Sequence, residues 1–327
     1  MSLISKLQAG LKFAGYCFSP DFRRSLQTLV RQQGEVTCYY SLDYQIEKYP
    51  ALDGDNPEIP LLKKININSD KTAIILQGPI WRGDSFTLDT CRLYRFLYPN
   101  VQIYLSIWDD EIIDNQNYWD ALGIFFVLSP KPKIFDGLGS LQFQVALVKN
   151  ALIRAKLDGV KFVFKGRCDQ RMLNPYFIKG FHYYSSLILS DENRLTFGLH
   201  DSIYYDPYKI NDQFMYGEID ELLIYWDDEV STLITIYKKI RQALGTSSPE
   251  QLLYARYLQN SKSIILDFSL AQYHESCGRF IAFTDEGSES MLWIKYPYRY
   301  KPHWSFNNRI WRQWNWLEWR ESAASFN

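Results

Sequence analysis

Cysteine is scarce in this sequence and shows no paired pattern. The five cysteines form no CxxC motif, and their odd number leaves at least one without a disulfide partner. Zinc clusters and the disulfide frameworks of secreted proteins need closely spaced or evenly numbered cysteines. The cysteine pattern therefore disfavours both classes and is typical of a reducing cytoplasm.

Strong charge of one sign and long apolar runs are also missing. The formal net charge is −1 over 327 residues, so no global basic field exists to attract nucleic acid. No apolar run approaches the length that spans a bilayer. Lys6 and Lys12 interrupt the apolar residues near the N-terminus, which leaves no signal-peptide core. We expect a cytoplasmic protein, soluble or peripheral on the inner face of the membrane, with no nucleic-acid partner.

Several catalytic signatures are absent. The sequence contains neither GxGxxG nor GxxxxGK[ST], and it has no HExxH, GxSxG or EF-hand pattern. These absences argue against a dinucleotide fingerprint, a P-loop nucleotidase, a metalloprotease, a serine hydrolase and a calcium sensor.

Aromatic residues, in contrast, are abundant. They make up 17 % of the chain, with 24 Tyr and 10 Trp. Tyr and Trp combine a flat apolar face with a polar group, which suits sugar rings and bases as well as ordinary cores. The apolar fraction of 46 % is enough for a sizeable core.

From residue 71 onward, short apolar runs alternate with helical patterns. The apolar runs predict strands over 72–78, 101–108, 124–129, 161–165, 194–200, 212–217 and 262–268. Helical periodicity and capping residues predict helices over 84–98, 141–158, 218–226, 228–245 and 248–260. This alternation predicts an α/β fold with a mostly parallel, Rossmann-like sheet flanked by helices.

The chain divides into three parts. Residues 1–70 give mixed signals and are expected to form an N-terminal extension, residues 71–275 form the main domain, and residues 276–327 form a tail rich in Trp and Arg. Trp with basic side chains suits a lipid headgroup region. The tail therefore either binds a membrane surface or packs on the core as an ordinary helix.

Polar residues collect where the first two predicted strands end, which is where open parallel sheets bind ligands. The first strand runs into Gln77, Gly78 and Pro79. Glycine allows a ligand to approach the backbone closely, although glycine followed by proline is also ordinary turn chemistry. The second strand ends in Trp108 and Asp109. The acidic residues that begin with Asp109 either accept hydrogen bonds from a ribose or cap the next helix.

The strand at 161–165 runs into the motif "KGRCDQR". Its three cations, Lys165, Arg167 and Arg171, can together neutralise a diphosphate. Asp169 between them either holds Mg²⁺ or Mn²⁺ beside phosphate oxygens or pairs with an arginine.

Three later residues are candidates for contact with substrate or for acid–base chemistry. His200 ends a predicted strand, Asp212 precedes an apolar run and should emerge at a strand edge, and Glu250 lies in the first turn of a predicted helix. A carboxylate close to an acceptor hydroxyl can act as a general base. Asp201 and Asp206 are further possible bases in this stretch, although Asp206 before Pro207 is more typical of a turn.

Four segments of the chain carry a resemblance to a known family. "TAIILQGPI", "TLDTCRLYRFLYPNVQIYLSIWDDE", "KFVFKGRCDQR" and "NDQFMYG" occur in the order seen in the WavE lipopolysaccharide-synthesis family, which the chain resembles over residues 72–275. The resemblance implies a GT-A-like, nucleotide-sugar-binding catalytic domain. The implied activity is a glycosyltransferase that moves a sugar from a nucleotide-sugar donor to a saccharide or lipid-linked saccharide acceptor of a surface polysaccharide. A non-catalytic nucleotide- or sugar-binding module and a nucleotidyltransferase remain as alternatives.

The resemblance also implies roles for individual residues. Gln77, Gly78 and Pro79 would border the nucleotide. The central motif lies where GT-A enzymes place a metal-binding aspartate, which is Asp169. Asp212 matches the aspartate of the last segment and is the candidate general base, with Glu250 as the weaker alternative. Arg171 stands where the second carboxylate of a DxD motif would be. A requirement for Mg²⁺ or Mn²⁺ is therefore left open, and Arg171 is expected to supply part of the missing positive charge.

Overall fold

The computed structural model describes part of the chain. The residues it describes are 64–133, 138, 140–172, 174–186, 195–198, 206–227, 229–245, 247–284 and 291–293. The chain divides into two units, residues 1–50 and 51–327, and every described residue belongs to the second. The expected N-terminal extension lies almost entirely outside the described residues, and so does the tryptophan-rich end of the expected tail.

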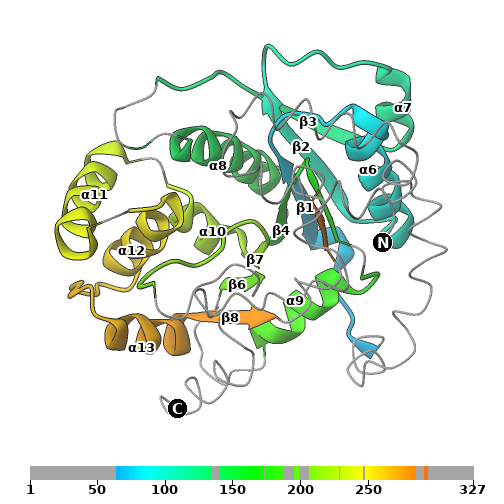
Figure 1. Cartoon of the computed structure of the whole chain (residues 1–327). Helices are drawn as coiled ribbons and strands as arrows, with labels where there is room; N and C mark the ends of the chain where they lie inside the picture. Colours follow the sequence, from blue (N-terminus) through cyan, green and yellow to red (C-terminus); the bar gives the residue numbers. More distant parts are fainter. Residues whose placement is uncertain are drawn as a thin grey trace, which may run out of the picture. The chain divides into compact units, whose positions relative to one another are not determined.

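A seven-stranded sheet organises the second unit, with the strand order β3-β2-β1-β4-β7-β6-β8 (Figure 1). Its strands are β1 (Thr72–Gln77), β2 (Gln102–Trp108), β3 (Ile124–Ser129), β4 (Phe162–Arg167), β6 (Leu195–Gly198), β7 (Met215–Glu218) and β8 (Ile281–Thr284). β7 runs antiparallel to both of its neighbours, whereas the other pairings are parallel. The expected fold class, a mostly parallel sheet flanked by helices, is confirmed.

The central strand β1 is buried along its whole length, which explains why it is a continuous apolar run and does not alternate. Side chains from its two faces enter different cores. Ala73 and Ile75 belong to a core shared with helices α8, α10, α11, α12 and α13. Ile74 and Leu76 belong to a second core shared with α6, α7 and α9. The sheet is therefore the middle layer of three.

The helices follow from periodicity and capping. They are α6 (Phe86–Leu97), α7 (Gln116–Ala121), α8 (Leu141–Leu157), α9 (Phe177–Ser186), α10 (Ile219–Tyr225), α11 (Val230–Leu244), α12 (Pro249–Ser261) and α13 (Leu270–Phe280). Steps of four and three residues predict one apolar face for α8, and all of its residues are buried: Leu141, Val145, Val148, Leu152 and Ala155. Gly159 follows this helix with a φ of +82°. α12 begins with a capping box between Ser248 and Gln251.

One predicted strand is wrong. Residues 262–268 form an irregular connection, in which Ile264 and Leu266 pack against the core while Ile265 is 90 % exposed. A short apolar run cannot be told apart from an extended loop by periodicity alone. The seventh strand is instead β8, which follows α13. A separate pair of strands, β5 (Gln170–Met172) and β9 (Met291–Trp293), lies beyond the end of β4.

None of the described helices has both the length and the apolar character that crossing a bilayer requires.

Candidate functional site

The parallel register brings three of the predicted motifs to one edge of the sheet. Gln77 at the end of β1 lies opposite Ser106 of β2 and Arg167 of β4. Trp108 at the end of β2 lies opposite Ser129 of β3. The strand ends that the sequence singled out are therefore neighbours, which is the arrangement that ligand sites of open α/β sheets use.

The turn after β1 is open to a ligand. Gly78 has a φ of +109°, its N–H donates to the carbonyl of Ser106 at 3.0 Å, and a Cβ built on it would meet nothing within 4 Å. Gln77 is buried and accepts a hydrogen bond from the N–H of Cys168 at 3.1 Å, whereas Pro79 is exposed. Glycine is needed here for its backbone conformation, and the space beside it permits close approach.

The end of β2 leads to two exposed carboxylates, Asp109 and Asp110, of which Asp110 pairs with Lys131. Trp108 is buried and packs edge-on against Phe143, with ring centroids 5.4 Å apart. The N–H of Asp109 donates to the carbonyl of Ser129, and its carboxylate is exposed without a hydrogen-bond or ion-pair partner among the described residues. The next helix, α7, has Asn115 at its N-cap position. The capping alternative for Asp109 is therefore not seen.

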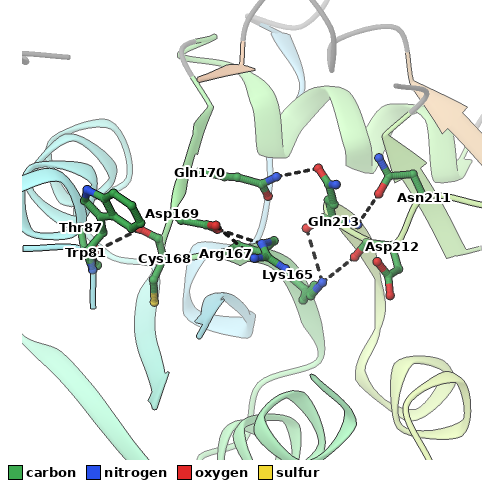
Figure 2. A network of polar contacts seen from close by, with 10 residues as sticks. All are labelled: Trp81, Thr87, Lys165, Arg167, Cys168, Asp169, Gln170, Asn211, Asp212 and Gln213. Atoms are coloured by element: carbon green, nitrogen blue, oxygen red, sulfur yellow. Dashed lines mark hydrogen bonds and ion pairs between the residues drawn. The ribbon is translucent and has the colours of Figure 1, made fainter. Parts of the chain in front are cut away.

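Arg167 and Asp169 form a bidentate ion pair beyond the end of β4 (Figure 2). Nε of Arg167 donates to Oδ1 of Asp169 at 2.8 Å, and a terminal guanidinium nitrogen donates to Oδ2 at 3.1 Å. Burial opposes the charge of Arg167, but the Asp169 carboxylate outweighs it, so the pKa of the guanidinium is raised. Both side chains keep some exposure, at 22 % and 13 %. The pair thus stays reachable from solvent.

This ion pair occupies the oxygens with which Asp169 was expected to hold a metal. Both carboxylate oxygens already accept from Arg167. Among the described residues, no group of three or more His, Cys, Asp and Glu side chains could hold a metal ion. A divalent cation takes several oxygen ligands, so the donor set seen around Asp169 does not fit Mg²⁺ or Mn²⁺.

Arg171 is turned away from this edge and into the core. Its side chain is 0 % exposed, and its guanidinium donates to Oγ1 of Thr90 and to the carbonyl of Phe86, each at 2.9 Å. It also stacks 4.4 Å from the ring of Phe86. Burial lowers its pKa to about 10. These contacts with α6 favour a structural role over the expected contact with a diphosphate.

Lys165 is buried as well, on the opposite side of the motif. It is 1 % exposed, its Nζ donates to the carbonyl of Asp212 at 2.5 Å, and the same nitrogen lies 4.8 Å from the centre of the Trp226 ring. Burial lowers its pKa to about 8, against the opposing attraction of Asp212. The expected contact with a diphosphate does not fit this position.

Asp212 is held in the segment that leads into β7 and is 4 % exposed. Oδ1 of Asn211 accepts from the N–H of Gln213, and the Gln213 side chain accepts from Gln170 (Figure 2). One carboxylate oxygen of Asp212, Oδ2, is buried and has no hydrogen-bond partner among the described residues. Such a group costs free energy unless a ligand or solvent satisfies it, so Asp212 remains a candidate for contact with a ligand.

A second carboxylate lies in the same neighbourhood. Glu250 stands in the first turn of α12, and its pKa is raised by burial and then by the negative charge of Asp212. Burial, and after it the negative charges of Asp212 and Glu250, raise the pKa of the Tyr225 hydroxyl well above its ordinary value. The hydroxyl of Tyr225 and the indole N–H of Trp226 are both buried without a partner among the described residues.

The structure therefore brings Lys165, Arg167, Asp169, Asp212 and Glu250 into one electrostatic cluster. It separates Arg171 from them, and His200 lies outside the described residues. Sequence reasoning missed Tyr225 and Trp226, because two aromatics at the end of an amphipathic helix look like ordinary core residues.

Comparisons with known proteins add little to this geometry. No protein-family model and no curated protein matches the sequence. Among solved structures, the chain resembles a mannose-1-phosphate geranyltransferase from Thermus thermophilus at 11 % identity and a TM-score of 0.33. The match covers 57 % of this chain and 68 % of that one. A likeness this distant does not bear on function, so the site itself has to carry the proposal.

Proposed function

We propose that the chain is a glycosyltransferase that moves a sugar from a nucleotide sugar to a hydroxyl of a saccharide acceptor. The observation that carries this proposal is the Asp212 carboxylate, which is buried with an unpartnered oxygen near the strand ends that hold the other motifs. The resemblance of four segments to the WavE family supports the same reaction class. Fold class alone would not, because one fold hosts many activities.

The two halves of the site suit two partners. At the strand ends, Gly78 offers backbone approach and Asp109 offers an exposed carboxylate to ribose hydroxyls or a base N–H. In this proposal the guanidinium of the Arg167–Asp169 pair, at the neighbouring strand end, contacts the diphosphate of the donor. Asp212, further along the same edge, faces the acceptor in this proposal.

The chemical step uses Asp212 as a general base. The carboxylate takes the proton of the acceptor hydroxyl while the acceptor oxygen forms a bond to the anomeric carbon. The bond from that carbon to the phosphate oxygen breaks, and the nucleoside diphosphate leaves with the electron pair. Positive charge held at the leaving oxygens stabilises the transition state, and we assign this role to Arg167 because its guanidinium keeps some exposure at the strand ends.

The acceptor and the site of action follow from the family resemblance. We propose a growing lipopolysaccharide or capsule chain, reached at the inner face of the membrane. Liposome flotation of the full-length protein against a version that ends near residue 300 tests whether the tail contributes. Equal flotation of the two proteins, or flotation of neither, removes the tail from the proposal.

A ligand panel followed by one substitution tests the reaction. Thermal shifts are measured with nucleoside diphosphates and nucleotide sugars, each with and without Mn²⁺, since a ligand at a hundred times its Kd stabilises by about 2.7 kcal/mol. Asp212→Asn should leave the shift unchanged and lower transfer about 10²–10⁴-fold. Wild-type nucleotide binding with no transfer or donor hydrolysis would indicate a binding module. Release of pyrophosphate would indicate a nucleotidyltransferase, and normal turnover by the variant would remove Asp212 from the mechanism.

A further inference from the structure

The contacts of Lys165 differ from those expected of its motif, which predicts contact with a diphosphate. The other conspicuous cation of this strand end, Arg167, reaches solvent, whereas Lys165 lies behind it in the core. Its ammonium group contacts the backbone of the Asp212 segment and one aromatic ring. A cation in this position can act on a substrate only through the residues that it holds.

The segment that carries Asp212 is tethered from several sides (Figure 2). Lys165 holds the carbonyl of Asp212 itself, and its Nζ also lies 3.5 Å from the carbonyl of Gln213. Gln170 donates to the side chain of Gln213 at 2.6 Å, and Asn211 accepts from the N–H of Gln213 at 2.9 Å. Among these contacts, the hydrogen bond from Lys165 is made to the backbone of Asp212, the residue that bears the carboxylate.

Charged groups and one aromatic ring surround the ammonium group of Lys165. The charged groups that act on Lys165 are Asp212 from the segment before β7, Arg167 and Asp169 from the end of β4, and Glu250 from α12. The indole of Trp226 covers the ammonium group with its face, an arrangement that stabilises a cation. The three carboxylates outnumber the other cation, so the positive charge of Lys165 also limits repulsion among them.

We propose that Lys165 is a positioning residue that fixes the orientation of the Asp212 carboxylate, rather than a ligand of the donor diphosphate. This inference rests on the proposed function, because it assigns Asp212 the role of base. Misplacement of a reacting group by about 1 Å can cost about 10²-fold in rate. Loss of Lys165 should therefore lower turnover strongly while nucleotide binding stays intact.

The test compares Lys165→Met and Lys165→Arg with the wild type, and Lys131→Met serves as the matched control. Lys131 is an exposed lysine near the same edge that pairs only with the exposed Asp110 among the contacts seen. Three readouts are measured: affinity for uridine and guanosine diphosphates by calorimetry, turnover as a function of pH, and amide hydrogen exchange of a peptide spanning residues 210–216.

For Lys165→Met we expect nucleotide Kd within about twofold of the wild type, kcat lower by about 10²-fold, and faster exchange over residues 210–216. Lys165→Arg keeps the charge and should restore part of kcat. Its turnover should persist above pH 8, where a lysine with a pKa of about 8 loses its proton. Lys131→Met should match the wild type in every readout.

Two results would overturn the inference. A tenfold or larger rise of the nucleotide Kd in Lys165→Met would make Lys165 a diphosphate ligand. Unchanged exchange over residues 210–216 would show that it does not hold the segment. If the wild type binds neither diphosphate and transfers no sugar, the proposed function fails, and the exchange measurement still decides whether Lys165 fixes Asp212.

Discussion

Substitution of Arg171 separates a structural role from a binding role most cleanly. The guanidinium makes two charge-assisted hydrogen bonds to α6, through Thr90 and the carbonyl of Phe86, in a site without exposure. Hydrogen bonds from a charged group contribute about 1.5–3 kcal/mol each. Methionine retains most of the packing against Phe86 and removes the cost of burying a charge. We therefore expect Arg171→Met to lower the free energy of unfolding by about 2–4 kcal/mol.

For a domain of this size, such a loss lowers Tm by roughly 4–15 °C, which calorimetry or urea unfolding resolves. Affinity for a nucleoside diphosphate should not change in the surviving folded protein. Arg92→Met is the control, because Arg92 lies exposed on the same helix α6 and pairs with Asp89 three residues before it. Exposed pairs of this kind contribute below about 1 kcal/mol. Full stability of Arg171→Met together with weaker nucleotide binding would refute the structural role.

Three further predictions concern the neighbourhood of the site. Burial lowers the pKa of Lys165 from 10.5 to about 8, so the unfolded chain binds more protons between these values and stability should rise with pH across this window. The gain in the free energy of unfolding amounts to about 3 kcal/mol. Urea unfolding of the wild type and Lys165→Met measures it between about pH 7.5 and 9.5. A difference in free energy between the two proteins that does not change over this range would contradict the prediction. Ser248→Ala removes the hydroxyl oxygen that accepts a hydrogen bond from the N–H of Gln251. The same substitution removes the hydrogen bond between Ser248 and Glu250 that lowers the pKa of Glu250. It should cost about 1 kcal/mol in urea unfolding and raise the pKa of Glu250, measured by carboxyl NMR; an unchanged Glu250 titration would argue against this contact. Gly78→Ala places a Cβ at a φ of +109°, which should cost about 1–3 kcal/mol and weaken binding of a nucleoside diphosphate in calorimetry; wild-type affinity would show that the turn is not approached by the ligand.

Much of the fold could be predicted because local pattern and tertiary burial agree there. β1 is a continuous apolar run because helices cover both faces, and the apolar stripe of α8 matches its buried face. The strand expected at 262–268 failed because β-branched residues in an exposed connection produce the same pattern as an edge strand. β8 was missed because its four residues carry no clear signal until the parallel pairing with β6 is known.

At the site, the sequence predicted which strand ends lie together but not which side chains are buried. The rule that ligands bind at the carboxyl ends of parallel strands placed Gln77, Trp108 and Arg167 together correctly. It could not tell which cations of the central motif face solvent. Lys165 is buried by Trp226 and Arg171 by α6, and both partners lie far along the chain. When distant segments bury a side chain, the neighbouring sequence does not indicate that burial.

The central claim, that this edge of the sheet binds a nucleotide sugar, is tested most directly by a crystal structure with the nucleoside diphosphate that stabilises the protein most in the thermal-shift panel. We predict the nucleoside beside Gly78 and Asp109, the diphosphate against Arg167, and an empty space between the terminal phosphate and the Asp212 carboxylate that a sugar can fill. A nucleotide bound away from the carboxyl edge of the sheet would contradict the claim, as would a diphosphate contacted by Lys165 or Arg171.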